Sequence, residues 1–261
     1  MKRFLSLVYG LLAYGIFLPT LVYAILFIGN IVVPKTIDSG GPQPPLLLAV
    51  AIDALLLGVF AAQHSIMARQ GFKRVWTQVV PKHLERPTYV LASSLVLILL
   101  LWQWRPIPQT VWELHGPVAM LLTGTFWLGW ILLFSSTFLI NHFELFGVQQ
   151  VWGYFHGTQY GGAIFRTPVL YRIVRHPLYL GFVIAFWSAP RMSLGHLIFS
   201  IATTGYILLG IYLEERDLVA EHGEAYRTYR EQVPMLIPFP KTSKHSLDGA
   251  RGDNGRRAHT K

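Results

Sequence analysis

Long stretches without charge dominate the pattern of apolar and polar positions along this chain. Residues 4–34, 87–104 and 116–140 contain no Asp, Glu, Lys or Arg, and residues 46–63 contain only Asp53. About 20 consecutive apolar residues in a helix cross the roughly 30 Å hydrocarbon core of a bilayer. The pattern therefore predicts four membrane-spanning helices.

Two further apolar stretches, 178–190 and 194–213, are separated only by "RMS", which is typical of a helical hairpin whose first arm is short. A basic pair at the amino terminus resembles the start of a signal peptide. The apolar run that follows is about twice as long as a signal-peptide core, so we expect a true span. The chain is thus predicted to be an all-α integral membrane protein of about five to six transmembrane helices with a C-terminal helical hairpin.

The basic residues fix the expected orientation. Five Lys and Arg lie within 64–87 and three within 141–177, whereas the alternate connections hold one each. Because cytoplasmic loops carry the excess of Lys and Arg, these two segments and both termini are expected in the cytoplasm. The net charge of +9 then reflects topology and attraction to anionic lipid, and implies no nucleic-acid partner.

The chain is expected to form one membrane domain, 1–240, followed by a charged, disordered tail, 241–261. Segment 141–177 is long, polar and aromatic, which favours a lid or binding loop. After the last span we expect a short amphipathic helix ending near Gly223, a turn with two tyrosines, and an apolar strap bounded by prolines. The absence of cysteine excludes disulfides, thiolate metal ligands and a cysteine nucleophile.

The stretch "YRIVRHPLYLG" crowds charge against the start of the hairpin. Pro177 suits the first position of a helix, which places His176 at the cap with Arg175 beside it. Free backbone N–H groups, the helix dipole and a cation would then converge into a site for an anion. Tyr179 shares a face with His176, and Gly181 would let another backbone or a flat ligand approach.

Two carboxylates, Glu214 and Glu215, stand at the same end of the other hairpin arm. Carboxylates at a helix C-terminus oppose the dipole, so helix stability does not explain them. Tyr206 and Gly210 precede Glu214 at intervals of four and form a polar stripe with a gap at the glycine. This mouth suits a zwitterionic ligand with hydroxyls; the alternative is an interfacial ion pair beside arginines that anchor the span.

The ordered motifs "RHPLYLG", "EE", "GEAYRTY" and "VPMLIPFP", within 165–240, resemble the isoprenylcysteine carboxyl methyltransferase-like membrane methyltransferases. Three more segments, "QHSIMAR" (63–69), "ERPTYVL" (85–91) and "NHFELFGVQQVW" (141–152), are similar to one bacterial branch of that family, the methanethiol S-methyltransferases. The resemblance implies a bacterial cytoplasmic membrane and S-adenosyl-L-methionine bound at the cytoplasmic mouth of the hairpin.

The same resemblance assigns roles to individual residues. Phe165 and Arg166 would supply loop contacts, and Tyr171 would cover the cofactor. His176 and the residues after it would hold the amino-acid end and the sulfonium, and Glu214 would accept hydrogen bonds from the ammonium or the ribose hydroxyls. The expected cofactor site is Phe165, Arg166, Tyr171, Arg175, His176, Pro177, Leu178, Tyr179, Gly181 and Glu214.

The expected substrate is a small hydrophobic thiol. Where the prenylcysteine enzymes place a substrate-binding arginine, one turn before the glutamate, this chain has Gly210, so a carboxylate-bearing prenyl peptide is not expected. Attack of a thiolate on a sulfonium turns two ions into neutral products, which a dry site accelerates. We expect in-line methyl transfer to methanethiol, giving dimethyl sulfide.

A base is needed because free thiols have pKa values of about 8.5 or higher. The candidates are His142, Glu144 and His64. The first two lie where the fourth span enters the long loop, where partial desolvation raises the basicity of a carboxylate, and we favour Glu144 with His142. His64 shares a helix face with Asp53, an acid within the membrane, which favours a functional role for both. The alternative for His64 is an anchor at the membrane interface, and the alternative for Asp53 is a helix-to-helix hydrogen bond.

Two other functions remain open at this point. The methyl acceptor is a lipid or a hydrophobic amine in the first, and the chain is a small transporter or haem-handling membrane protein in the second. No HxxxH or HExxH spacing occurs, so no metal site is expected. The expected partners are the thiol substrate and the lipid bilayer, and no motif implies an obligate protein partner.

Overall fold

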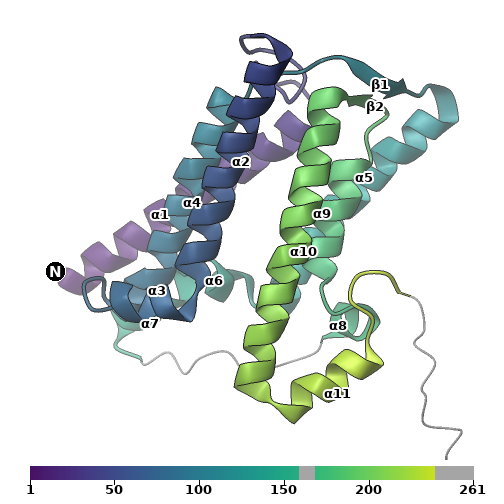
Figure 1. Ribbon diagram of the computed structural model, residues 1–261. Helices are drawn as coiled ribbons and strands as arrows, with labels where there is room; N and C mark the ends of the chain where they lie inside the picture. The colour runs from purple at the N-terminus through teal and green to yellow at the C-terminus, as the bar shows by residue number, and fades with distance from the viewer. Residues whose placement is uncertain (159–167, 239–261) are drawn as a thin grey trace, which may run out of the picture.

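The computed structural model describes residues 1–158 and 168–238, and about three quarters of these are helical (Figure 1). Among them, five helices are long and apolar enough to cross a membrane: α1 (Lys2–Ile28), α2 (Leu46–Ala68), α4 (Lys82–Gln103), α5 (Gly116–Ile140) and α10 (Leu194–His222). The predicted all-α membrane architecture is confirmed. Phe165, Arg166 and the tail 241–261 lie outside the described residues.

Shorter elements connect these helices. They are α3 (Gln70–Trp76), β1 (Thr110–Glu113), α6 (His142–Leu145), α7 (Val148–His156), α8 (Val169–Ile173), α9 (Pro177–Trp187), β2 (Arg191–Ser193) and α11 (Glu224–Gln232). The helix end expected near Gly223 is confirmed, but the expected short amphipathic helix is the continuation of the last span, since α10 runs unbroken to His222. No Gly or Pro occurs between Gly210 and Gly223, so nothing in the sequence breaks the helix there.

The predicted hairpin with a short first arm is present as α9 and α10. Pro177 is the first residue of α9, and the 11-residue helix is about 16 Å long, roughly half of the hydrocarbon thickness. Beyond α9 the chain leads into β2, which pairs antiparallel with β1. The Phe186 carbonyl near the helix end accepts hydrogen bonds from His196 Nε2 at 2.9 Å and Ser200 Oγ at 2.8 Å.

The long helices form two groups that share one apolar core. Figure 1 shows α1, α2 and α4 on one side and α5, α9 and α10 on the other. Trp104, at the end of α4, joins the groups because its buried ring makes edge contacts with Phe27 of α1 and Phe199 of α10. Its indole N–H also donates to the Ile37 carbonyl at 3.0 Å. The interface between the two helix groups also contains polar side chains.

Helices α5 and α9 touch backbone to backbone. A Cβ atom on Gly129 would lie 2.7 Å from the backbone nitrogen of Ala185 and 2.7 Å from the carbonyl oxygen of Gly181. A Cβ on Gly181 would lie 2.7 Å from the Gly129 carbonyl oxygen. The two glycines therefore permit a close helix crossing, which positions the start of α9.

Replacement of Gly129 by Val is expected to lower the thermal stability of the detergent-solubilised protein markedly. The new side chain meets backbone atoms that cannot rotate away, so the cost lies at or above the usual 1–3 kcal/mol, on the order of 3 kcal/mol. Gly124→Val on the same helix is the matched control, because a Cβ there meets nothing within 4 Å. Equal melting temperatures for the two variants would contradict the close crossing.

Candidate active site

The mouth of the α9–α10 hairpin brings a guanidinium, an imidazole and a carboxylate together. Arg175 Nε lies 2.7 Å from Glu215 Oε1, and His176 Nε2 lies 3.1 Å from the same oxygen. All three side chains are buried. His176 is the N-cap of α9 because Pro177 begins the helix, and Glu215 projects from α10. The basic arm therefore does face the acidic arm, with Glu215 as the pairing acid.

The segment after α11, residues 233–238, folds over this ion pair and is called the strap below. The Pro234 carbonyl accepts from the Arg175 backbone N–H at 2.9 Å, and the Met235 carbonyl accepts from the His176 N–H at 3.2 Å. The expectation of free N–H groups for an anion is therefore wrong at these two positions. The reason is tertiary: carbonyl oxygens of a distant segment supply the acceptors.

Arg175 also binds the carboxyl-terminal region through its side chain. Its Nη1 donates to the Arg230 carbonyl at 2.9 Å and to the Val233 carbonyl. Together with the Glu215 ion pair, these bonds join α9 to α10, α11 and the strap. The structure thus gives Arg175 a clamping role within the fold rather than an open position for a ligand.

Glu214, one position earlier on α10, points toward a different partner. Tyr179 OH donates to Glu214 Oε2 at 3.0 Å, and within residues 1–158 and 168–238 this is the one hydrogen bond to the carboxylate. Its Oε1 therefore keeps its capacity to accept. The Tyr179 ring lies 5.7 Å from the His176 ring. A half-buried carboxylate with an open oxygen beside aromatic faces can bind an ammonium group or hydroxyls.

The other predicted residues at the start of α9 serve packing. Pro177 is fully buried, and Leu178 packs against the apolar core. Gly181 contacts the backbone of α5, so of its two sequence-based alternatives the approach of another backbone is the one observed. These three residues position the polar ends of their neighbours.

Three tyrosines border the mouth: Tyr171 of α8, and Tyr226 and Tyr229 of α11. Tyr229 OH donates to the Tyr171 carbonyl, which ties α11 to α8. Burial raises the pKa of the Tyr171 and Tyr226 hydroxyls, and raises that of Tyr229 to about 12. All three therefore stay protonated near neutral pH. Tyr171 lies within electrostatic range of Glu214. This position is compatible with the role that the family resemblance assigns to Tyr171, which is to cover the cofactor.

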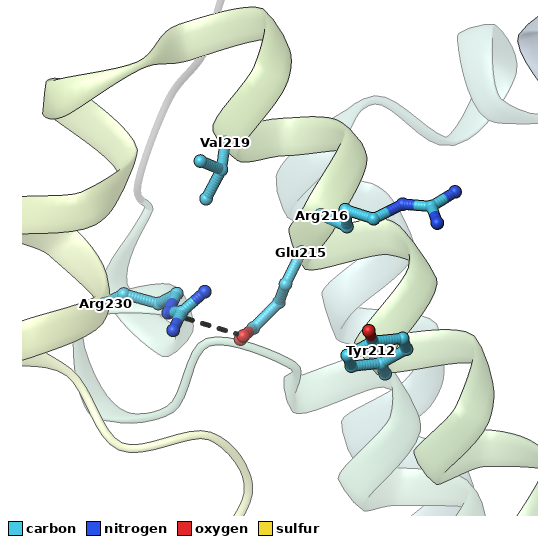
Figure 2. A pocket seen from close by; sticks show the side chains of 5 residues that line it. All are labelled: Tyr212, Glu215, Arg216, Val219 and Arg230. Atoms are coloured by element: carbon cyan, nitrogen blue, oxygen red, sulfur yellow. Dashed lines mark ion pairs between the residues drawn. The ribbon is translucent and has the colours of Figure 1, made fainter.

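A recess of about 290 Å³ opens between α10 and α11, beside Glu215 (Figure 2). It is lined by Tyr212, Glu215, Arg216, Val219 and Arg230. The Glu215 carboxylate reaches Arg230 Nε at 3.7 Å on this side while its other oxygen binds Arg175. Glu215 is thus held from both sides, and Glu214 remains the carboxylate with an open oxygen.

A polar cluster continues from the mouth into the interface between the two helix groups. On α2 and α4, His64 Nε2 lies 2.8 Å from Tyr89 OH. Ser65 Oγ lies 3.0 Å from Tyr206 OH, which joins α2 to α10. Tyr89 and Tyr206 both lie within electrostatic range of Tyr179. We call Tyr89, Tyr179 and Tyr206 the tyrosine cluster.

The favoured base candidates lie elsewhere. His142 Nε2 lies 2.7 Å from Tyr14 OH and its Nδ1 lies 2.9 Å from Thr137 Oγ1, which joins α6 to α1 and α5. Burial lowers the pKa of His142. Glu144 accepts from Asn141 Nδ2 at 3.0 Å. In the described part of the chain, no hydrogen bond or ion pair joins either residue to Glu214.

Asp53 is separated from this chemistry. It is buried, and its Oδ1 accepts from the Arg105 backbone N–H at 2.8 Å, just after the end of α4. The hydrogen bond therefore runs from α2 to a connecting segment near the β-sheet end of the bundle. The sequence-based alternative is a helix-to-helix hydrogen bond, and the observed bond differs from it in that the donor lies just beyond α4.

Sequence reasoning missed three residues of the site. Glu215 was recognised as half of the "EE" pair, but the choice between the two acids needs the rotation of α10. Tyr89 lies inside "ERPTYVL", a segment noted without a role for its tyrosine. Tyr206 was placed on the stripe that contains Glu214, yet its partner Ser65 comes from a helix 141 residues away.

Comparison with known proteins shows which family this is. The NnrU protein family matches residues 54–217, which run from α2 through Glu214 and Glu215 of α10. The chain belongs to the NnrU family. Methanethiol S-methyltransferase 2 of Bradyrhizobium diazoefficiens is 52% identical over 236 residues, covering 90% of this chain and 91% of that protein.

Other relatives agree with this placement. Methanethiol S-methyltransferase of Mycobacterium tuberculosis is 52% identical over 241 residues, covering 92% of this chain and 98% of that protein. A more distant relative, Nurim of Homo sapiens, is 29% identical over 203 residues, covering 69% of this chain and 76% of that protein. No solved structure matches. The resemblance drawn from the motifs is confirmed, and the chain is an enzyme of the methyltransferase class.

Proposed function

We propose that this NnrU-family methyltransferase moves a methyl group from S-adenosyl-L-methionine to methanethiol and releases dimethyl sulfide. The observation that carries the proposal is identity of about one half, over about nine tenths of the chain, with proteins named methanethiol S-methyltransferase. The hairpin mouth adds a site with matching donor and acceptor groups. The reaction has no need for a metal or a second protein.

The residues at the mouth fit a zwitterionic, sulfonium-bearing donor. Glu214 Oε1 is open to an ammonium or to hydroxyls, and Tyr179 holds the other oxygen at 3.0 Å. The rings of Tyr171 and Tyr179 offer aromatic faces, which attract onium cations. His176, fixed by Glu215, presents its ring beside Tyr179. Phe165 and Arg166 complete the site by family resemblance and lie outside the described residues.

S-adenosyl-L-methionine, when bound, supplies a methyl group on a positively charged sulfur. The chain contributes by holding the thiol in line with that methyl group and by excluding water from the pair. Transfer of the methyl group from a sulfonium to a thiolate neutralises both charges. It is faster in a site where little water stabilises the separate ions. We place the thiol and the donor at the interface between the two helix groups, next to Glu214.

The same end of the bundle is proposed to face the cytoplasm of a bacterial inner membrane. It carries the Arg69–Asp217 pair at 3.0 Å and the Lys73–Glu85 pair at 3.7 Å, together with the basic end of the hairpin. The excess of basic side chains at this end fits the positive-inside rule. Both termini are then cytoplasmic, and the membrane domain extends over 1–240.

The test uses the full-length protein purified in detergent. Protein supplied with S-adenosyl-L-methionine and methanethiol should release dimethyl sulfide into the headspace, measured by gas chromatography, and calorimetry should show binding of the donor. Binding without dimethyl sulfide, with methyl label appearing in added lipid or amine, would move the acceptor to those classes. Absence of donor binding would remove the proposal.

A further inference from the structure

His64 has a hydroxyl partner at each ring nitrogen. Its Nδ1 lies 3.3 Å from Ser93 Oγ and its Nε2 lies 2.8 Å from Tyr89 OH. The Phe60 ring stacks on the imidazole at a centroid distance of 5.4 Å and an angle of 19°. With Nδ1–H donating to Ser93, Nε2 accepts the Tyr89 proton. The Tyr89 oxygen then keeps lone pairs that can accept a proton from another group.

The pair also lies at the right place in the fold. His64 and Tyr89 belong to α2 and α4, on one side of the interface between the two helix groups. Tyr179, which binds Glu214, belongs to the other side and lies within electrostatic range of Tyr89. The Ser65–Tyr206 hydrogen bond, next to His64, holds the sides together. A thiol between them would have the tyrosine oxygen on one side and the proposed methyl donor on the other.

We propose that Tyr89 and His64 form the proton acceptor for the thiol, an inference that rests on the proposed function. The thiol S–H proton passes to the Tyr89 oxygen while the Tyr89 proton passes to His64 Nε2, which leaves an imidazolium. The thiol sulfur forms its new S–CH₃ bond as the carbon–sulfur bond of the donor breaks, with the electron pair staying on the donor sulfur. The total charge is unchanged, and His64 later returns its proton to solvent.

The charged groups around the pair favour loss of the thiol proton, although they oppose the positive charge that develops on His64. Arg69, just after α2, and Arg86 of α4 both lie within electrostatic range of Tyr89. Tyr206 and Tyr179 are the titratable groups that face it from α10 and α9, and Glu214 lies behind Tyr179. The two guanidinium groups stabilise negative charge on a thiol sulfur that is losing its proton.

The structure contains a second set of the same composition, which serves as a built-in comparison. Tyr14, His142 and Thr137 repeat the tyrosine–histidine–hydroxyl arrangement, with the tyrosine oxygen 2.7 Å from Nε2. This set binds α1 to α5 and α6, and no described hydrogen bond or ion pair links it to Tyr179 or Glu214. Both sets therefore have the hydrogen bonds that a base needs. What distinguishes the set of His64 and Tyr89 is its position next to the proposed donor site.

The test measures dimethyl sulfide formation by Tyr89→Phe and His64→Gln across pH. At pH 7 both variants should be slower than the parent protein by roughly 10²- to 10⁴-fold, the usual contribution of a positioned base. Their rates should then rise about tenfold per pH unit toward pH 9, because only thiolate formed in solution reacts. The parent rate should be nearly flat over this range. Calorimetric affinity for S-adenosyl-L-methionine should stay within about twofold of the parent, since neither side chain touches Glu214.

Tyr14→Phe is the matched control, since it removes the same hydroxyl from the second set, and its pH profile should stay flat. Parent-like rates in Tyr89→Phe overturn the relay, as does a loss of rate without the pH slope, because structural damage lowers the rate at every pH. Both outcomes leave dimethyl sulfide formation by the parent protein intact. Failure of the parent to form dimethyl sulfide overturns the relay and the proposed function together. If His64→Gln loses donor binding, Tyr89→Phe, which removes one oxygen atom, decides the question.

Discussion

Glu214→Gln should weaken the binding of S-adenosyl-L-methionine by roughly 10- to 100-fold. The amide keeps the shape of the side chain and can still accept from Tyr179 OH, but it loses the negative charge that attracts an ammonium group. Hydrogen bonds to charged groups contribute about 1.5–3 kcal/mol, and each 1.36 kcal/mol is a factor of ten in affinity. Calorimetric titration of the purified variant measures the effect directly.

Glu221→Gln is the control for this substitution, because Glu221 is an exposed carboxylate on the same helix, about two turns further on. It removes the same charge away from the mouth and should leave the affinity unchanged. Equal affinities for Glu214→Gln and the parent would show that the open oxygen of Glu214 does not face the donor. Equal losses in both variants would instead indicate a general effect of net charge.

Arg175→Met should lower the free energy of unfolding by about 3–5 kcal/mol, the usual effect of removing one partner of a buried ion pair. The substitution removes the 2.7 Å partner of Glu215 and the guanidinium that donates to the carbonyls of Arg230 and Val233. For a chain of this size, the corresponding fall in melting temperature is on the order of 10 °C. Thermal unfolding in detergent measures it, and faster proteolysis near the strap should accompany it.

Two comparisons isolate the cause. Arg216→Met changes a neighbouring arginine whose side chain is 63% exposed, and it should have little effect. Adding Glu215→Gln to Arg175→Met should recover part of the lost stability, because it removes the buried carboxylate that has lost its nearest cation. A melting temperature of Arg175→Met equal to that of Arg216→Met would contradict the clamping role.

The strap and the end of α11 supply acceptors for the cationic groups that precede α9. The N–H groups of Arg175 and His176 and the Arg175 guanidinium all bind carbonyls of residues 230–235. Carbonyl oxygens are acceptors without net charge, so the buried pair of Arg175 and Glu215 stays balanced. The carboxylate left for a ligand is then Glu214, whose other oxygen is held by Tyr179.

Local properties of the chain were readable from the sequence. The spans follow from the length of uncharged stretches, since a helix of given length and composition either crosses a bilayer or does not. The start of α9 follows from Pro177, whose fixed backbone and missing N–H suit a first helical position. The short first arm of the hairpin follows from the "RMS" interruption. The motifs around these elements also placed the chain in its family.

Other features depend on how helices rotate and which segments meet, and these only the tertiary structure decided. Successive helical residues point about 100° apart, so whether Glu214 or Glu215 faces Arg175 depends on the packing of α10 against α9. The acceptors for the Arg175 and His176 N–H groups come from a strap almost 60 residues later. The pairing of His64 with Tyr89, and of both with the hairpin, likewise requires two separately formed helix groups to dock, a contact that hydropathy and local spacing do not specify.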